Sequence, residues 1–251
     1  MHLQNALYVA FSCASLATAA YTLQDSCIGS SFQNCFNFYS GVDPTNGFVR
    51  YQNQTEALAQ GLYQVSGNNV YLNVDSKNAA PNGRPSLRLE SKKMYNRGLF
   101  ILDVMHMPAS TCGSWPSFWT FGPEKTWPAN GEIDIIEGIH DSTRNAMSLH
   151  TSDGCTITGT GSTGTVKTKN CYVNAAGQTS NAGCGVDDKS ASSFGTPLNP
   201  KFGGIYAMQW TSTGIKMWFF PPRLDPIQHV RQQPGSLALG HAERKLCRQR
   251  L

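Results

Sequence analysis

Charged residues are scarce in this sequence, and the signatures of several enzyme classes are missing. Charged side chains make up 14% of the 251 residues, against about 25% in an average soluble domain, while small polar residues and glycine are plentiful. This balance argues against a helical bundle or a disordered chain and favours turn-rich β structure. The sequence also has no C-x-x-C pair of a zinc ribbon, no H-E-x-x-H of a metalloprotease and no G-x-S-x-G of a serine hydrolase.

Long apolar runs are rare, and the longest lies at the N-terminus, over residues 6–20. At about 15 residues this run is short for a membrane-spanning helix. It ends in the small residues A-T-A-A, which is the pattern of a signal-peptide cleavage site, although no basic residue precedes it. We therefore predict a signal peptide at 1–20, a secreted mature chain that begins at Tyr21, and no membrane association after cleavage.

The cysteine count agrees with export. Cys13 lies in the predicted signal peptide and Cys247 near the C-terminus, which leaves Cys27, Cys35, Cys112, Cys155, Cys171 and Cys184. An even number of cysteines in an oxidising compartment favours disulfides. Three bridges are possible, and the sequence leaves about 15 pairings open.

The most informative stretch is GEIDIIEG at residues 131–138, where three carboxylates alternate with isoleucines. Isoleucine favours strands, and side chains alternate along a strand, so Glu132 and Asp134 share one face. Strict alternation sends Glu137 to the core face, where an unpaired carboxylate is costly. We predict a β-bulge near Ile135 that returns Glu137 to the face of the other two acids.

Three acids on one face suit cleavage of a glycosidic bond. One carboxylate acts as nucleophile and another as proton donor, about 5–5.5 Å apart when configuration is retained. Two other interpretations remain open for these residues. The acids can be the solvated side chains of an edge strand, or they can bind a divalent cation.

Two motifs give the stretch a family context. WPSFWTFG at 115–122 and WPANGEIDIIEG at 127–138 resemble glycoside hydrolase family 16, in particular its laminarinase-like branch. The resemblance extends over about residues 21–220 and includes LHT at 149–151 and GGIYAMQW at 203–210. It implies an all-β fold, a curved antiparallel β-sandwich of the jelly-roll type, whose concave face binds β-1,3 or mixed β-1,3/1,4 glucans.

The resemblance also implies roles for the acids. In the family the first glutamate of the motif is the nucleophile and the last is the acid/base, which correspond here to Glu132 and Glu137, with Asp134 assisting. This retaining mechanism needs no cofactor and no metal.

Several residues near the acids are candidates for substrate binding. Aromatic rings stack on sugar rings, so Trp115 and Trp119, four residues apart and predicted to share a strand face, and Trp127 are expected to line the cleft, although large aromatics also fill cores. His150 is expected near the acid/base or a sugar hydroxyl. Arg97 is expected either in the cleft or in a surface ion pair.

The rest of residues 21–221 reads as one domain of strands and turns. Residues 99–107 are apolar on both faces until Asp103 and predict a buried strand, while 205–210 and 215–220 flank a turn and predict a hairpin. Residues 222–251 lack this alternation and hold six basic residues against two acidic ones, a net +4 that equals the whole chain's charge. The basicity therefore does not indicate nucleic-acid binding. We hypothesise a shifted frame or splice junction in this tail, so that the last strands of the sandwich are missing.

Together these observations predict a secreted, monomeric endo-β-glucanase with retaining chemistry. A non-catalytic glucan-binding protein and a cell-wall transglycosylase are the alternatives. The three acids favour an enzyme over a binding protein, and only product analysis separates hydrolysis from transfer.

Overall fold

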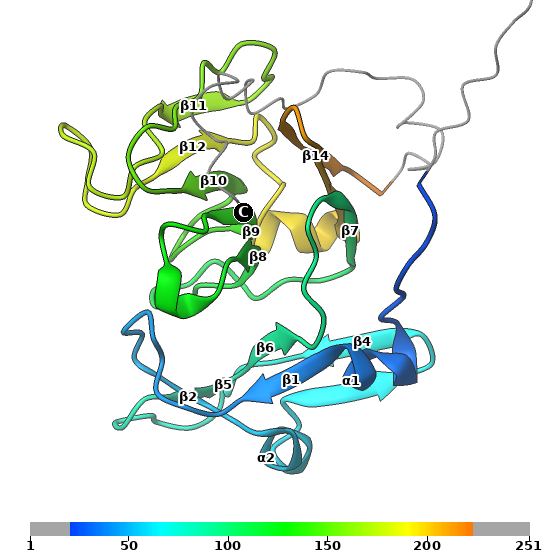
Figure 1. Ribbon diagram of the computed structural model, residues 1–251. Helices are drawn as coiled ribbons and strands as arrows, with labels where there is room; N and C mark the ends of the chain where they lie inside the picture. Colours follow the sequence, from blue (N-terminus) through cyan, green and yellow to red (C-terminus); the bar gives the residue numbers. More distant parts are fainter. Residues whose placement is uncertain (1–20, 223–251) are drawn as a thin grey trace, which may run out of the picture.

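The computed structural model describes residues 21–222, and strands make up most of its regular structure (Figure 1). The helices are η1 Gly29–Ser31, α1 Phe32–Cys35, α2 Gln54–Ala59, η2 Glu124–Thr126 and η3 Thr196–Lys201. The strands are β1 Phe36–Tyr39, β2 Val49–Tyr51, β3 Tyr63–Ser66, β4 Asn69–Leu72, β5 Arg84–Ser86, β6 Arg88–Ser91, β7 Gly98–Val104, β8 Ser117–Phe121, β9 Glu132–Glu137, β10 Ala146–His150, β11 Thr165–Thr168, β12 Cys184–Asp187, β13 Gly204–Trp210 and β14 Ile215–Phe220.

The predicted signal peptide and almost all of the predicted basic tail lie outside the described residues. Both therefore stay predictions, as do the domain boundaries at residues 20 and 221. Within 21–222, none of the helices has the length and apolar character that crossing a membrane requires.

Two antiparallel sheets form the larger part of the molecule. One has the strand order β11-β12-β10-β9-β8 and the other β14-β13-β7. In the second sheet, β13 and β14 pair from Ile205–Phe220 to Trp210–Ile215, which confirms the predicted hairpin.

The main hydrophobic core lies between these two sheets. The first sheet contributes Ile133, Ile135 and Met147, and the second contributes Met208 and Met217, all at most 5% exposed. The two sheets bury their apolar faces against each other, which is the arrangement of a β-sandwich. The predicted antiparallel β-sandwich is therefore confirmed.

The prediction of a strand buried on both faces at residues 99–107 is only half right. β7 forms as expected, but Ile101 is 61% exposed. The reason is topological, because β7 lies at the edge of its sheet among the described strands and turns only alternate side chains to the core.

The N-terminal part, drawn in blue and cyan in Figure 1, consists of two-stranded pairs and a small second core. β1-β6 and β3-β4 are antiparallel, whereas β2-β5 is parallel. Helix α2 packs Ala57 against Leu62 and Tyr63. The helix begins at a capping box, in which Asn53 Oδ1 accepts from the N–H of Glu56 and Glu56 Oε2 accepts from the N–H of Asn53.

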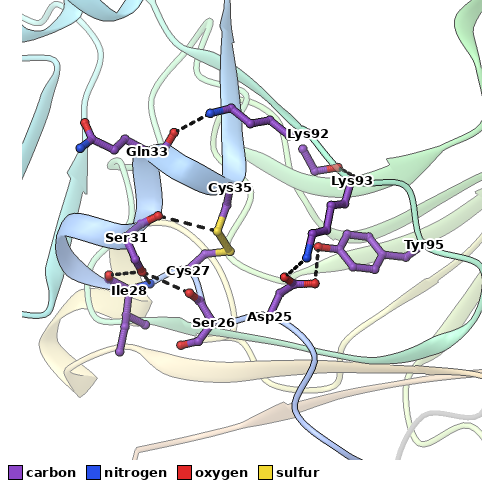
Figure 2. Close-up of a disulfide and its surroundings, with 11 residues drawn as sticks. Asp25, Ser26, Cys27, Ile28, Ser31, Gln33, Cys35, Lys92, Lys93 and Tyr95 are labelled. Carbon is purple, nitrogen blue, oxygen red and sulfur yellow. Dashed lines mark hydrogen bonds and ion pairs between the residues drawn. A yellow bond between two sulfur atoms is a disulfide. The ribbon is translucent and has the colours of Figure 1, made fainter.

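A disulfide between Cys27 and Cys35 closes a short loop ahead of β1 (Figure 2). Beside it, Tyr95 Oη donates to Asp25 Oδ2 at 3.1 Å, and Lys93 forms an ion pair with the same carboxylate. These contacts attach the start of the described chain to the segment that follows β6.

A second disulfide joins Cys171 to Cys184, at the start of β12. Neither disulfide includes Cys155, and the thiol of Cys112 is free and exposed. Two of the three possible bridges therefore exist among residues 21–222. The sequence could not predict which cysteines pair.

Candidate active site

The predicted β-bulge interrupts β9 where the acids require it. Against β8, Trp119 pairs with Asp134 and Phe118 pairs with Ile136, so Ile135 has no partner of its own. The register between β9 and β10 shifts at the same place. A bulge inserts one residue and re-aims the side chains that follow it.

The bulge brings the three carboxyls to one face of the sheet. The acids pair with every second residue of β8: Glu132 with Phe121, Asp134 with Trp119, and Glu137 with Ser117. Alternate residues of a strand share a face, and directly paired residues project to the same side. Glu132, Asp134 and Glu137 therefore form one row, as predicted.

Indole N–H groups hold both glutamates. Nε1 of Trp115 donates to Oε1 of Glu137 at 2.9 Å, and Nε1 of Trp127 donates to Oε2 of Glu132 at 2.5 Å. Both rings remain exposed, at 63% and 37%. The predicted position of these two tryptophans beside the acids is consistent with this geometry, and their contact with a sugar stays a prediction.

One detail of the prediction for Trp115 is wrong. This residue lies in the loop before β8 and not on the strand face that it was expected to share with Trp119. β8 begins only after Pro116, which lacks the N–H that a strand ladder uses.

Asp134 and His150 form the buried centre of the site, with exposed fractions of only 2% and 7%. Oδ2 of Asp134 lies within ion-pair distance of Nε2 of His150, at 3.1 Å. Oδ2 of Asp134 and Nδ1 of His150 are both buried without a hydrogen-bond partner. His150 was predicted to lie near the acid/base or a sugar hydroxyl. The structure places it against Asp134, in the same row of acids, and its contact with the acid/base or with a sugar stays a prediction.

Burial is the main cause of the raised pKa values of the three acids. It raises the pKa of Glu132 to about 7, with the negative charge of Asp134 acting in the same direction. Burial also raises the pKa of Asp134 and of Glu137, against the opposing contacts of His150 and Trp115. Burial acts to lower the pKa of His150, but the neighbouring acids outweigh it and raise that pKa. Glu132 therefore retains its proton up to about neutral pH.

A row of aromatic rings continues from the acids toward the N-terminal part. Trp119 stacks on Phe121 with 4.7 Å between ring centroids, and the guanidinium of Arg88 lies 5.4 Å from the ring of Trp119 and 5.8 Å from that of Phe121. Arg88 comes from β6 and also lies 5.3 Å from the ring of Tyr39. The sequence pattern around Arg88 gave no signal for this contact, which is formed only in the folded chain.

The expected place of Arg97, in the cleft or in a surface ion pair, stays a prediction. Arg97 precedes β7, with a φ of 72° and an exposed side chain. Of the two arginines, Arg88 is the one that contacts the aromatic row beside the acids.

The carboxylates and His150 also offer a ligand set for a cation. One ligand atom from each of Glu132, Asp134 and His150 lies within 4.8 Å of the others. Together with Glu137, the carboxylates also match a glycosidase site, because Glu132 and Glu137 form a pair on one strand and each accepts a hydrogen bond from an indole N–H. The fold and the site thus resemble those of a β-sandwich glycosidase.

Comparison with known proteins identifies the family. Residues 36–244 match the family described as the XgeA-like, catalytic GH16 domain, so the chain belongs to glycoside hydrolase family 16. An endo-1,3(4)-beta-glucanase of Arthroderma benhamiae is 46% identical over 211 residues, or 83% of this chain and 46% of that protein. Another, probable, endo-1,3(4)-beta-glucanase, of Aspergillus niger, is 42% identical over 89% of this chain and 30% of its own length.

Two solved structures are similar to this chain in both sequence and fold. An elongating GH family 16 beta-1,3-glucosyltransferase superposes with a TM-score of 0.78 at 42% identity, covering 88% of this chain and 75% of that one. Laminarinase 16A from Phanerochaete chrysosporium, with beta-glucans in donor and acceptor sites, gives 0.74 at 41% identity, covering 80% and 67%. The chain spans less than half the length of the two curated glucanases.

Proposed function

We propose that this chain is an endo-β-glucanase that hydrolyses β-1,3 or mixed β-1,3/1,4 glucans with retention of configuration. The observation that supports this most directly is the bulge in β9, which aligns Glu132, Asp134 and Glu137 on one face. The names of the relatives support the same substrate class, since they are glucanases, a laminarinase and a glucosyltransferase.

The reaction proceeds in two displacements. The Glu132 carboxylate attacks the anomeric carbon while the Glu137 carboxyl gives its proton to the glycosidic oxygen, so the C–O bond breaks and a glycosyl ester forms on Glu132. Glu137 is then a carboxylate and takes a proton from water. The resulting hydroxide adds to the anomeric carbon and releases Glu132, so both glutamates return to their starting states.

Asp134 takes up the proton that Glu132 must lose before it can attack. Burial raises the pKa of both Asp134 and Glu132, so the two carboxyls together retain a proton close to neutral pH. When Asp134 holds this proton, Glu132 is ionised and can attack. The indole N–H of Trp127 stabilises that ionised form, because hydrogen bonds to a carboxylate favour its charge.

Glucosyl transfer is the second candidate, because one of the similar solved structures is a beta-1,3-glucosyltransferase. The same glycosyl ester is then intercepted by a sugar hydroxyl in place of water. A non-catalytic glucan-binding role is less well supported, since binding alone does not require three aligned acids. From the apolar run at residues 6–20 we further propose that the chain is secreted, and we propose separately that it acts as a monomer.

The test compares the expressed chain and its Glu132→Gln variant on laminarin, lichenan and barley glucan. The unmodified chain should release reducing ends, and early NMR spectra should show the β anomer. Glu132→Gln should lose activity by about 10⁴-fold or more, because the proposed mechanism gives the attack on the anomeric carbon to the carboxylate of Glu132. Products longer than the substrate would instead indicate transfer.

Glu56→Gln provides the matched control. It makes the same chemical change in α2, where glutamine also satisfies a capping box, and should leave activity intact. An active Glu132→Gln variant refutes the nucleophile assignment, and an initial α product refutes retention.

A further inference from the structure

At the bulge in β9, two backbone groups lack the hydrogen-bond partner that a regular strand ladder would give them. The side chain of Asn145 forms hydrogen bonds with both. Its Nδ2 donates to the carbonyl oxygen of Ile135 at 2.8 Å, and its Oδ1 accepts from the N–H of Glu137 at 2.9 Å. One amide thus replaces the missing strand partner, at the extra residue Ile135 and at Glu137 two residues further on.

The orientation of this amide is fixed by chemistry. A backbone carbonyl can only accept and a backbone N–H can only donate, so rotating the amide by half a turn would break both bonds. Asn145 is 1% exposed, which leaves no water to replace it freely. Buried backbone groups almost always have a partner, and here the partner is a side chain.

Asn145 is itself held in place from the other side. Its own N–H donates to Oγ of Ser193 at 3.0 Å, and its carbonyl accepts from the N–H of Asp188 at 2.8 Å. Ser193 is fully buried, and its carbonyl accepts from Oη of Tyr206 on β13 at 2.6 Å. A chain of hydrogen bonds therefore runs from the opposite sheet of the sandwich to the bulge.

We propose that Asn145 is a positioning residue, which directs the carboxyl of Glu137 toward the glycosidic oxygen by holding the bulged backbone. This inference rests on the proposed function, in which Glu137 is the acid/base. Without Asn145, the bulge loses the bonds that distinguish it from a regular register. A regular register would turn Glu137 to the opposite face of β9.

Two contacts then set the position of Glu137. Asn145 fixes its backbone from inside the sandwich, and Trp115 binds its carboxyl from the exposed side. Small displacements are costly for proton transfer, because an error of about 1 Å can lower the rate by roughly 10²-fold. The loss of Asn145 should therefore affect the steps that need Glu137 more than the binding of glucan.

The experiment uses two substrates that differ in their need for an acid. Laminarin has a poor leaving group and needs protonation by Glu137, whereas a dinitrophenyl β-laminaribioside has a leaving group that departs without it. Asn145→Ala should lower kcat on laminarin by about 10²-fold with little change in KM. The glycosylation step on the aryl glycoside, followed as a burst of dinitrophenolate, should change far less.

Azide gives a second readout. It attacks the glycosyl ester without a general base, so it should accelerate turnover of the aryl glycoside by Asn145→Ala and not by the unmodified chain. Asn145→Asp, which is nearly the same size, covers the case in which the alanine variant does not fold. It should show the same pattern at a pH above the pKa of the introduced aspartate, because an ionised aspartate cannot donate to the carbonyl of Ile135.

Asn199 provides a matched control. Its side chain makes the same pair of bonds to the backbone of Met107, accepting from its N–H at 2.9 Å and donating to its carbonyl at 3.0 Å. Asn199→Ala should lower the melting temperature without azide rescue and without a difference between the two substrates. The inference is overturned if folded Asn145 variants lose activity equally on both substrates or retain it on both. If the unmodified chain cleaves neither substrate, it is the proposed function that fails.

Discussion

Two buried aspartates in this molecule have pKa values shifted in opposite directions. The contrast distinguishes a carboxylate that stabilises the fold from one that takes part in the proposed reaction. Asp43, in the loop between β1 and β2, is 7% exposed and accepts hydrogen bonds from Thr45 and Gly47. Arg88 adds a positive charge at 3.9 Å. Burial acts to raise the pKa of Asp43, but these partners outweigh it and lower the pKa.

Asp134, on β9, is 2% exposed and has far fewer partners. His150 lies 3.1 Å from its Oδ2, and no hydrogen bond satisfies that oxygen. Burial therefore prevails, and the charge of Glu137 adds to it, so the pKa of Asp134 is raised. A group that is buried with too few partners favours its neutral form, and this makes it available to exchange a proton.

The difference suggests a division of labour between the two parts of the molecule. In the N-terminal part, hydrogen bonds and Arg88 compensate the buried charge of Asp43, which therefore contributes stability. On β9, Asp134 lacks such compensation and favours its protonated form, at a cost in stability. Substitutions in the two parts should therefore have opposite consequences for activity and for folding.

The largest expected effect is that of Asp134→Asn on activity. An amide cannot take up or release the proton that is shared with Glu132, so kcat on laminarin should fall by about 10²- to 10³-fold. The free energy of unfolding should not fall with it, because the substitution removes a poorly compensated buried charge. Steady-state kinetics and urea denaturation on the same preparation check both halves, and an active but unstable variant would contradict the contrast with Asp43.

The next largest effect is that of Asp43→Asn on stability. The amide cannot accept all of the bonds from Thr45 and Gly47, so unfolding should become easier by about 1–3 kcal/mol at neutral pH, while kcat stays unchanged. The lowered pKa fixes the sign of the pH dependence. This stabilisation is present above the usual pKa of aspartate and is lost as pH falls through the lower folded-state value, so the two proteins should converge in acid. A gap that persists unchanged in acid would refute the assignment.

The sequence predicted β9 and its bulge because local rules conflict there. Alternating isoleucines require a strand, and the spacing of Glu137 breaks the alternation, so only an extra residue reconciles the two. The hairpin of β13 and β14 followed from an equally local pattern. The family resemblance added the roles of the acids and the shape of the sandwich.

Other features depend on contacts that no local sequence pattern predicts. Arg88 meets Trp119 only when β6 and β8 come together, and Asn145 reaches the bulge from a loop before β10. Neither residue belongs to a periodic pattern that sequence reasoning could detect. The exposed side of β7 at Ile101 was missed for the same reason, since an apolar strand at a sheet edge looks like one at the centre.

The smallest expected effect is a gain in stability from Glu132→Gln that depends on pH. The pKa of Glu132 is about 7 in the folded chain, against an ordinary value of 4.5. The folded chain therefore binds more protons than the unfolded chain between these values, and its stability falls as pH rises through them. Glutamine does not titrate, so the variant escapes this loss.

The size and sign of this gain can both be measured. A shift of this size corresponds to at most about 3 kcal/mol, and partial exposure and the shared proton of Asp134 reduce it to the order of 1 kcal/mol. Urea denaturation from about pH 4 to about pH 8 should show no gain at the acid end and a plateau at the alkaline end. Glu56→Gln, in the N-terminal part, should show no such rise. A gain that is independent of pH would mean that the carboxyl of Glu132 is as well solvated as an ordinary surface acid, and the contrast between the two parts of the molecule would then be lost.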